Sequence, residues 1–310
     1  MNQLACLIIL WKGKLPDERL RSLKQLVATG CHVHFVSDHS VDFDAPNFFL
    51  HPLPQQLVFE QIGATVGLTH AAGYKLVDFK IFIWDCMTSI TAQYECWGFA
   101  DIDVIYNASI GDRIHAAVTA SNQSSQALIF GDRGHFMLFS KRAGDAILAH
   151  IRDHGHLPYL RRALASRRAH LLDEFRFGHK IFARMHQQGD VIWHRDHFQP
   201  LVDISYWSRQ PTDSRNGAIT ALYINDGVVL VTVAGHTVCP VYVHIQKRSV
   251  NSRSGLQAGQ ATGYFHLMRS GGLVISDAPE VFRTSWCSDG IYRLRMIVSR
   301  LKAKMFTEIL

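Results

Sequence analysis

The sequence lacks the short motifs that identify several large protein classes. Its six cysteines form no Cys-x-x-Cys pair and its histidines no His-Glu-x-x-His arrangement, so the sequence does not indicate a zinc site. It also has no P-loop and no Gly-x-Gly-x-x-Gly fingerprint, the glycine-rich turns that hold phosphates in many ATPases and dinucleotide-binding enzymes. Most of the cysteines lie in apolar runs, which favours reduced, buried thiols in a cytoplasmic protein.

Long hydrophobic runs are also missing. The segment 4–11 is apolar, but it is far too short to cross a bilayer. No basic residue precedes it, and Lys12 and Lys14 follow it, an arrangement that does not fit a signal peptide. We therefore interpret this segment as a first buried strand and expect a protein that is soluble or peripheral to a membrane.

Charge is only modestly unbalanced. The formal net charge of the 310 residues is +6, and the Lys and Arg residues are dispersed apart from a few adjacent pairs, among them Arg161-Arg162 and Arg167-Arg168. Such an excess suits a phosphorylated substrate, an anionic membrane surface or nucleic acid, and it does not choose among them. A hydrophobic content of 47% is ordinary for a globular enzyme and is enough for one large α/β domain or two small ones.

The N-terminal half alternates between strand and helix patterns. After the strand 4–11, the segment 16–29 places its leucines on one helical face and ends at Gly30, and a short strand follows over 32–36. This order predicts a right-handed crossover and a parallel sheet with ligands at the carboxyl ends of its strands. Asp38 lies at one of those ends. It is interpreted either as a turn residue or as a contact with a nucleoside.

Two further helices are expected over 55–68 and 74–87. In the second, Lys75 and Asp78 are three residues apart and share a face, so an ion pair within the helix is the simplest interpretation.

The segment 97–106 that follows reads as an apolar strand interrupted by Asp101 and Asp103. On an extended backbone these two carboxylates point to the same side. Buried carboxylates need a cation, and a pair with this spacing suits Mg²⁺ or Mn²⁺. The chain holds a natural control: Asp42 and Asp44 have the same spacing but lie in a polar segment that we interpret as a solvated loop.

Five blocks of the sequence together carry a family resemblance. They are 74–80, 97–106, 134–139, 173–174 and 242–248. In these blocks and their order the chain resembles a poorly characterised, DUF6625-like bacterial family of GT-A-like glycosyltransferases found with polysaccharide biosynthesis genes. The resemblance covers residues 4–250, and it departs from the family pattern at Ile81, where a proline is expected.

The resemblance implies a fold and a domain organisation. The expected fold is α/β, a single GT-A-like domain with a mostly parallel mixed sheet flanked by helices, plus a C-terminal extension. The nucleotide-sugar-binding and catalytic domain would span 1–250, and residues 251–310 would form a loop and an extension that packs on it.

It also implies the residues that bind the donor. Asp101 and Asp103 would hold Mn²⁺ or Mg²⁺, with His244, at the end of the apolar strand 238–245, completing the coordination. Lys247 and Arg248 would face the phosphates, because cations stabilise the charge that develops on a leaving diphosphate.

By the same resemblance, Asp38, Lys75 and Asp78 would line the nucleoside pocket. Asp173 and Glu174 open a predicted helix that ends at residue 188, and one of them would take the proton from the acceptor hydroxyl. Asp173 is the better helix cap and Glu174 the better base.

The predicted function is a metal-dependent glycosyltransferase that moves a sugar from a nucleotide-diphosphate donor to a bacterial polysaccharide or glycolipid. The partners would be that donor and a saccharide or lipid-linked acceptor, without nucleic acid. A Mg²⁺-dependent nucleotidyltransferase and a non-catalytic nucleic-acid-binding protein are the alternatives. The arginine-rich segment 157–172 is a solvated helix face or a peripheral contact with the inner membrane, and both stay open. The neighbouring histidines 150, 154 and 156 are interpreted as histidine-rich surface.

Overall fold

The protein divides into two compact units. The structure is a computed structural model that describes residues 5–11, 13–51, 78, 80–166, 172, 177–203, 212–213, 217–225, 228–233, 236–244, 250–252, 262–267 and 273–276. Unit 1 comprises Met1–Ile102 and Ala108–Gln199, and unit 2 comprises Asp103–Asn107 and Pro200–Leu310. The domain boundary predicted at residue 250 stays a prediction.

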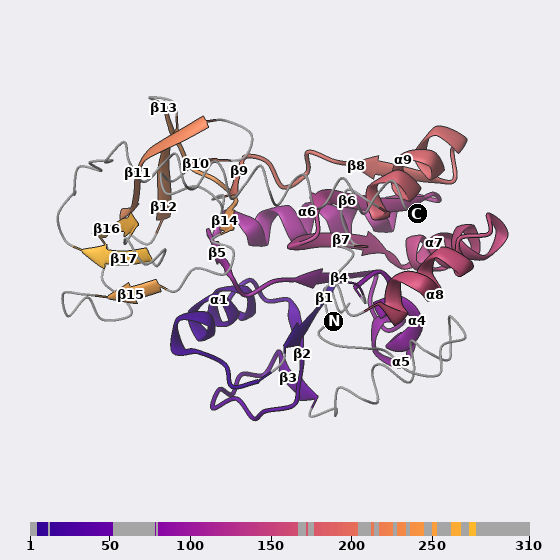
Figure 1. The fold of residues 1–310 in the computed structure, drawn as a ribbon, viewed down its shortest axis with the longest axis horizontal. Coiled ribbons are helices and arrows are strands. Elements are labelled where there is room, and N and C mark those ends of the chain that lie inside the picture. The colour runs from indigo at the N-terminus through magenta and orange to yellow at the C-terminus, as the bar shows by residue number, and fades with distance from the viewer. Residues whose placement is uncertain are drawn as a thin grey trace. The chain divides into compact units, whose positions relative to one another are not determined.

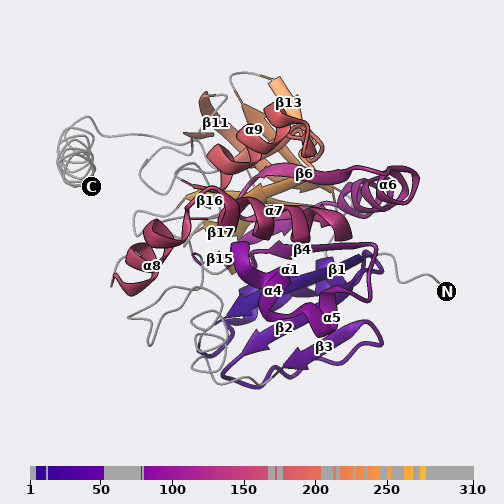
Figure 2. The same cartoon turned by 90° about the vertical axis from the view of Figure 1, so that its right-hand side faces the viewer.

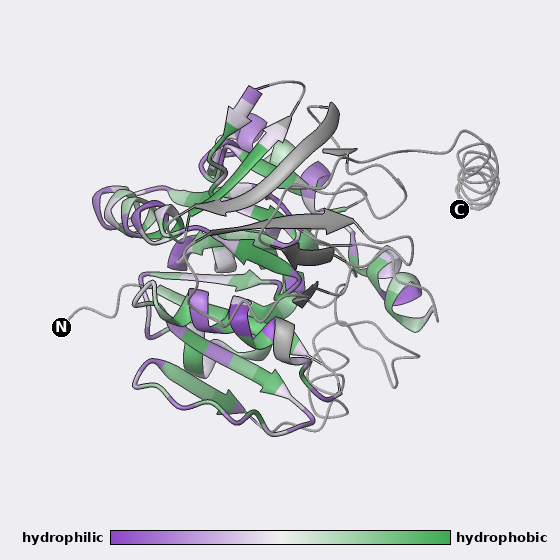
Figure 3. Cartoon of the chain, turned by 90° about the vertical axis from the view of Figure 1, so that its left-hand side faces the viewer, coloured by the Kyte–Doolittle hydropathy of each residue, from purple (hydrophilic) through white to green (hydrophobic). Residues whose placement is uncertain are grey.

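Unit 1 is built on a seven-stranded mixed sheet (Figure 1). Its strand order is β3-β2-β1-β4-β7-β6-β8, and β7 alone among these strands runs antiparallel to its neighbours. The strands are β1 Ala5–Trp11, β2 His32–Ser37, β3 Phe48–His51, β4 Cys96–Ala100, β6 Ala127–Arg133, β7 Phe136–Ser140 and β8 Val191–His194. The predicted mostly parallel mixed sheet is therefore confirmed, and Figure 3 shows that its strands are mainly apolar.

Helices cover this sheet on both faces. They are α1 Asp17–Val27, the 3-10 turn η1 Lys80–Phe82, α4 Ile83–Cys86, α5 Thr88–Thr91, α6 Ser109–Gln123, α7 Lys141–Asp153, α8 Leu157–Ala165 and α9 Gly178–Gln188. Figure 2 shows α4, α5 and α7 in front of β1, β2 and β4. Cys96 points the other way, because its thiol lies 3.9 Å from the Ala117 carbonyl of α6. In the described part of the chain, no helix is long and apolar enough to cross a membrane.

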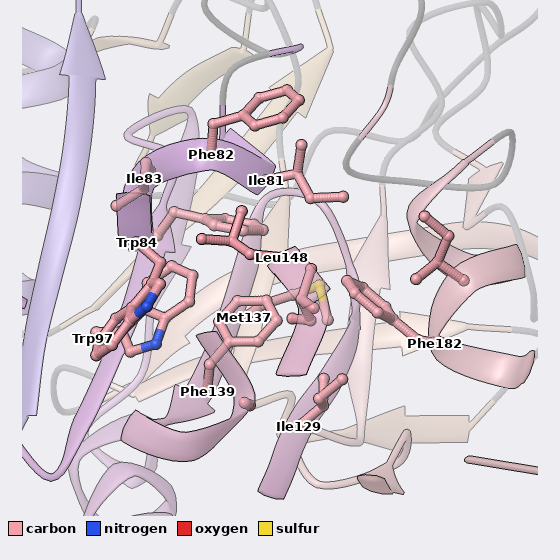
Figure 4. Packing of buried hydrophobic residues seen from close by; sticks show 14 of the residues in the cluster. Ile81, Phe82, Ile83, Trp84, Trp97, Ile129, Met137, Phe139, Leu148 and Phe182 are labelled. Atoms are coloured by element: carbon pink, nitrogen blue, oxygen red, sulfur yellow. The ribbon is translucent and has the colours of Figure 1, made fainter. Parts of the chain in front are cut away.

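The main core of unit 1 is aromatic and lies between the sheet and α4, α7 and α9 (Figure 4). Trp97 of β4 stacks on Phe139 of β7 with ring centroids 4.6 Å apart, and Trp84 of α4 lies 5.7 Å from Trp97. The Trp84 indole N–H donates to Asp145 of α7 at 2.8 Å, which ties the two helices together. Because aromatic rings bury a large apolar area, this cluster fixes the position of β4 and hence of the residues that follow it.

Gly98 lets β4 approach β7 closely. A Cβ at this position would collide with the Met137 carbonyl oxygen and lie 3.2 Å from the Leu138 Cα. We expect Gly98→Ala to lower the free energy of unfolding by about 1–3 kcal/mol, because backbone atoms cannot move aside as a flexible side chain can. Chemical denaturation of the two proteins measures this difference.

Gly111→Ala in α6 is the matched control, because its Cβ would meet Thr29 at an ordinary distance of 3.7 Å. It should leave stability unchanged or raise it by up to about 1 kcal/mol through helix propensity. Equal stability of Gly98→Ala and the wild type would show that β4 and β7 can separate without cost.

A chain of polar side chains joins β2, β3 and Tyr94 at one edge of the sheet. The Tyr94 hydroxyl lies 2.8 Å from His32 Nδ1 and 3.0 Å from His34 Nε2, and His34 Nδ1 lies 2.9 Å from His51 Nε2. Burial, with His51 and His32 nearby, lowers the pKa of His34 from 6.5 to about 3. Neutral imidazoles satisfy these contacts, and burial penalises the charged form of His34 because little water reaches it.

This pKa predicts acid sensitivity. His34 in the unfolded chain binds a proton below about pH 6.5 and in the folded chain only near pH 3, so stability falls as the pH falls between those values. We expect a contribution on the order of 1 kcal/mol, seen as a fall of roughly 2–4 °C in Tm that His34→Gln reduces. Thermal melts from pH 7 to pH 4 measure it, with exposed His115→Gln as control. Identical profiles for wild type and His34→Gln would contradict the assignment.

Several predicted elements are confirmed with small shifts. The strand and helix predicted over 4–11 and 16–29 are β1 and α1, and Gly30 after α1 has a φ of 82°, the left-handed conformation that favours glycine. The helix predicted over 74–87 is not continuous in its described part: a 3-10 turn precedes α4, and α4 ends at Cys86. The helix predicted over 55–68 lies outside the described residues.

The single strand predicted over 97–106 is wrong. β4 ends at Ala100, residues 101–103 form a bend, and β5, Val104–Tyr106, pairs with β14, Tyr242–His244, in another sheet. Asp101 and Asp103 therefore lie in the bend, where the chain leaves one ladder and enters the next. The argument from strand geometry, that both carboxylates point to one side, does not hold.

Unit 2 contains a three-stranded sheet of order β5-β14-β9, in which β9 is Leu201–Asp203. A second sheet contains β10 Thr212–Asp213, β11 Gly217–Asn225, β12 Val228–Val233, β13 His236–Val238, β15 Val250–Ser252, β16 Thr262–Leu267 and β17 Leu273–Ser276. Asn107 joins the two sheets: its buried amide donates to the Val229 carbonyl at 2.9 Å and accepts from the Val229 N–H at 2.6 Å. This clamp fixes β5 and the start of unit 2.

Candidate functional site

Asp101 lies at the end of β4 against a buried lysine. Its Oδ1 is 2.7 Å from Nζ of Lys80, whose side chain is only 7% exposed. The same ammonium donates to the Gly134 carbonyl at 2.6 Å and lies 5.3 Å from the centre of the Phe99 ring. Since a buried charge needs a partner of opposite sign, this ion pair anchors the side chains of Lys80 and Asp101 against each other.

The turn between β6 and β7 holds both members of this pair by hydrogen bonds. The Asp101 N–H donates to the His135 carbonyl at 2.8 Å, and Gly134 supplies the carbonyl that binds Lys80. His135 itself is buried. The block 134–139 thus has a clear structural task, which is to fix the backbone of Asp101 and the head group of Lys80.

Asp103, just before β5, faces His244 at the end of the neighbouring strand β14 of unit 2. His244 is in register with Val104, the residue after Asp103, and His244 Nε2 lies 3.5 Å from Asp103 Oδ1. The side chains are 23% exposed for Asp103 and 14% exposed for His244. Two ligands of one ion at about 2.1 Å each, roughly 90–110° apart, lie about 3.0–3.5 Å from each other, so this spacing fits a shared cation.

The chain itself connects Asp101 with Asp103. Only Ile102, which is buried, separates the two residues. Their Cα atoms therefore lie within about 7 Å of each other whatever the arrangement of the two units. Within unit 2, the Asp103 carboxylate and the His244 imidazole are oxygen and nitrogen donors of the kind that hard or borderline divalent cations accept.

Asp38 fastens the loop that follows β1. Its Oδ1 accepts the Gly13 N–H at 2.7 Å and lies 3.0 Å from His39 Nδ1. The hydrogen bonds from Gly13 and His39 lower the pKa of Asp38. Because β1, β2 and β4 are parallel neighbours, Gly13, Asp38 and Asp101 all follow carboxyl ends at the same edge of the sheet.

Asp78 is fully buried and joins two distant segments. Its Oδ1 accepts the Leu172 N–H at 3.3 Å, and the Leu172 carbonyl accepts the Gly178 N–H at 2.8 Å at the start of α9. This carboxylate therefore positions the chain just before α9. The other residues predicted to bind the donor or to act as base, which are Lys75, Asp173, Glu174, Lys247 and Arg248, lie outside the described residues.

A family model described as a family of unknown function, DUF6625, matches residues 7–267. The chain belongs to the DUF6625 family. No curated protein matches it. The chain is similar to a solved structure described as a glycosyltransferase involved in the glycosylation of the major capsid of PBCV-1, at 12% identity over 64% of this chain and 85% of that chain, with a TM-score of 0.31. A TM-score this low supports neither a shared fold nor a shared function.

Lys80 is the residue of this DUF6625 chain that the sequence reasoning missed. It belongs to the block 74–80, in which Lys75 and Asp78 were interpreted as an ion pair within a helix. Its position among Phe79, Ile81 and Phe82 could have indicated a buried ion pair, because a lysine inside an apolar run needs a buried partner.

The histidines 150, 154 and 156 lie close together, as stacked rings. The centroids of His150 and His154 are 3.9 Å apart, and those of His150 and His156 are 5.8 Å apart. His150 is buried, so the interpretation of all three as surface is wrong for this one. Burial, with the neighbouring histidines, lowers the pKa of His150 and of His156.

The five cysteines that the structure describes are free thiols. Cys6, Cys31 and Cys96 are buried, whereas Cys86 is half-buried and Cys239 exposed. Burial raises the pKa of Cys31 to about 11 and that of Cys96 to about 12, so these thiols stay protonated and unreactive at neutral pH. The prediction of reduced, buried thiols is confirmed for these three.

Proposed function

We propose that this protein is a metal-dependent glycosyltransferase that moves a sugar from a nucleotide-diphosphate donor to a bacterial polysaccharide or glycolipid. The observation that carries the proposal is the half-buried pair Asp103 and His244, whose side chains lie 3.5 Å apart, with Asp103 two residues after Asp101 in the chain. Such a donor set suits Mn²⁺ or Mg²⁺, which bind diphosphates through open coordination positions.

The ion would neutralise the charge that develops on the leaving diphosphate. Asp101, Asp103 and His244 would hold it, and the ion pair with Lys80 fixes the Asp101 side chain in place. Lys247 and Arg248 follow His244 by three and four residues and would add positive charge at the phosphates.

The arrangement of strands supports a GT-A-like donor site. Asp38, with the Gly13 loop that it fastens, and Asp101 follow the carboxyl ends of adjacent parallel strands, where ligands of open α/β sheets bind. The nucleoside would lie on the Asp38 side, with Lys75 as a further contact, and the diphosphate at Asp101. Asp78, which is fully buried, would act only by positioning the chain around Leu172. Glu174, or Asp173 beside it, would accept the proton of the acceptor hydroxyl.

Calorimetric titration tests the proposal directly. UDP, GDP and CMP are each titrated into the protein with Mn²⁺ and again with EDTA. We expect one nucleotide to bind only in the presence of the ion, which also identifies the nucleotide of the donor. Binding of no nucleotide, or binding that EDTA leaves unchanged, would overturn the proposal. Release of pyrophosphate in place of a nucleoside diphosphate during turnover would favour the nucleotidyltransferase instead.

A further inference from the structure

A second candidate binding site lies in unit 1, between α8 and α9. It is a pocket of about 340 Å³. It is lined by His156, Tyr159, Phe177, Lys180, Ile181 and Arg184. Ligand pockets commonly measure about 300–1,000 Å³, so this one has room for a single small unit such as a sugar ring and is small for a nucleotide.

The walls of the pocket are aromatic. The rings of Tyr159 and Phe177 are stacked, 5.5 Å apart at an interplanar angle of 23°, and His156 meets the Phe177 ring edge-on at 5.5 Å. Because Tyr159 and Phe177 already touch, a flat nucleobase cannot enter between them. Both rings belong to the lining of the pocket, and their apolar surface is of the kind against which the C–H groups of a sugar ring pack.

The rim of the pocket is cationic. Lys180 and Arg184 are exposed, and their spacing of four residues places them on one face of α9. No carboxylate belongs to the six lining residues, so a cationic ligand is disfavoured. Burial, followed by His154 and Arg184, lowers the pKa of His156, which keeps this ring neutral and able to hydrogen-bond a hydroxyl group.

Two hydrogen bonds, an ion pair and short stretches of chain lead from the pocket to Asp101 within unit 1. Phe177 precedes Gly178, whose N–H binds the Leu172 carbonyl, and Leu172 is held in turn by Asp78. Two residues after Asp78, Lys80 pairs with Asp101. The pocket therefore adjoins, along the chain, the segment 173–176 that carries the proposed base.

We propose that this pocket binds a sugar ring that carries an anionic group, as the acceptor subsite of the transferase. The ring lies on Tyr159 and Phe177, and its charged group pairs with Lys180 and Arg184. This inference rests on the proposed function for the role of the sugar as acceptor. The binding itself rests on the pocket alone and needs neither nucleotide nor metal.

Ligand-observed NMR titrations in EDTA test the binding. The probes are methyl glucuronide, glucose 6-phosphate, methyl glucoside and inorganic phosphate, with the full chain. We expect at least one anionic sugar to bind about tenfold or more tightly than methyl glucoside and inorganic phosphate. Arg184→Gln should weaken it about tenfold, and the combination with Lys180→Gln should weaken it further. Arg152→Gln on α7, also exposed, is the matched loss of charge and should change nothing.

Three outcomes would overturn the inference: no binding of either anionic sugar, equal binding of methyl glucoside, or equal binding of inorganic phosphate. Equal loss in Arg152→Gln would do the same, since it would show a general charge effect. Metal-dependent nucleotide binding by Arg184→Gln separates the two proposals. If this nucleotide binding persists and the wild type binds no anionic sugar, the pocket assignment is wrong and the transferase proposal stands. If the wild type binds anionic sugars but no nucleotide, the acceptor role and the transferase proposal are both wrong.

Discussion

Asp103→Asn is expected to abolish metal-dependent nucleotide binding and to lower the transfer rate by about 10²–10³-fold. The amide keeps the size of the side chain but removes the negative charge that faces His244 at 3.5 Å. A divalent cation then loses a charged ligand, and the leaving diphosphate loses the stabilisation that such an ion supplies. Calorimetry with the nucleotide that binds the wild type, in Mn²⁺, and a coupled assay of nucleoside diphosphate release measure the two effects.

The chain supplies the control for this substitution. Asp42→Asn removes a carboxylate from the other Asp-x-Asp pair, which is exposed between β2 and β3. It should leave nucleotide binding and turnover unchanged. Thermal melting of both variants shows whether each protein remains folded. Full metal-dependent binding by a folded Asp103→Asn protein would remove Asp103 from the site and, with it, the main support for the transferase.

Local patterns predicted the sheet of unit 1 well. Segments 4–11, 16–29 and 32–36 have the hydrophobic periods of strand, helix and strand, and each became the expected element because nothing in the tertiary structure opposes these periods. The apolar stretch 97–106 was predicted wrongly because its local pattern does not show which strands its two halves pair with. Its pattern reads as one strand, but Val104 to Tyr106 pairs with residues 242–244, and a partner so distant leaves no trace in a local pattern.

The candidate site was predictable where residue chemistry is unusual for its surroundings. Asp101 and Asp103 stand out because carboxylates are rare among buried aliphatic and aromatic residues. His244 followed from a resemblance, since a histidine at a strand end is ordinary by itself. Lys80 could not be assigned to Asp101 from sequence, because twenty residues and several elements separate them and only the fold brings their charges together. The aromatic pocket at α8 and α9 could not be predicted, because Tyr159 and Phe177 are far apart in the sequence and only the fold brings their rings together.

Lys80→Met should have the largest effect on stability. It leaves the Asp101 carboxylate without its cation and the Gly134 carbonyl without its donor. Breaking a buried ion pair costs about 3–5 kcal/mol; the Asp101 side chain is 29% exposed, so we expect a loss of about 3 kcal/mol in the free energy of unfolding. Denaturation in EDTA measures this loss without a contribution from bound metal.

A double-mutant cycle with Asp101→Asn identifies the origin of the loss. The neutral amide does not need a cation, so Lys80→Met in the Asp101→Asn background should cost less than in the wild type, with a coupling energy of about 1–2 kcal/mol. Lys141→Met is the matched control: Lys141 also donates to a backbone carbonyl, that of Ala92 at 2.7 Å, but it is exposed. It should cost less than about 0.5 kcal/mol. Strictly additive losses would mean that Lys80 stabilises the fold through Gly134 and Phe99, and that Asp101 is held by the His135 turn instead.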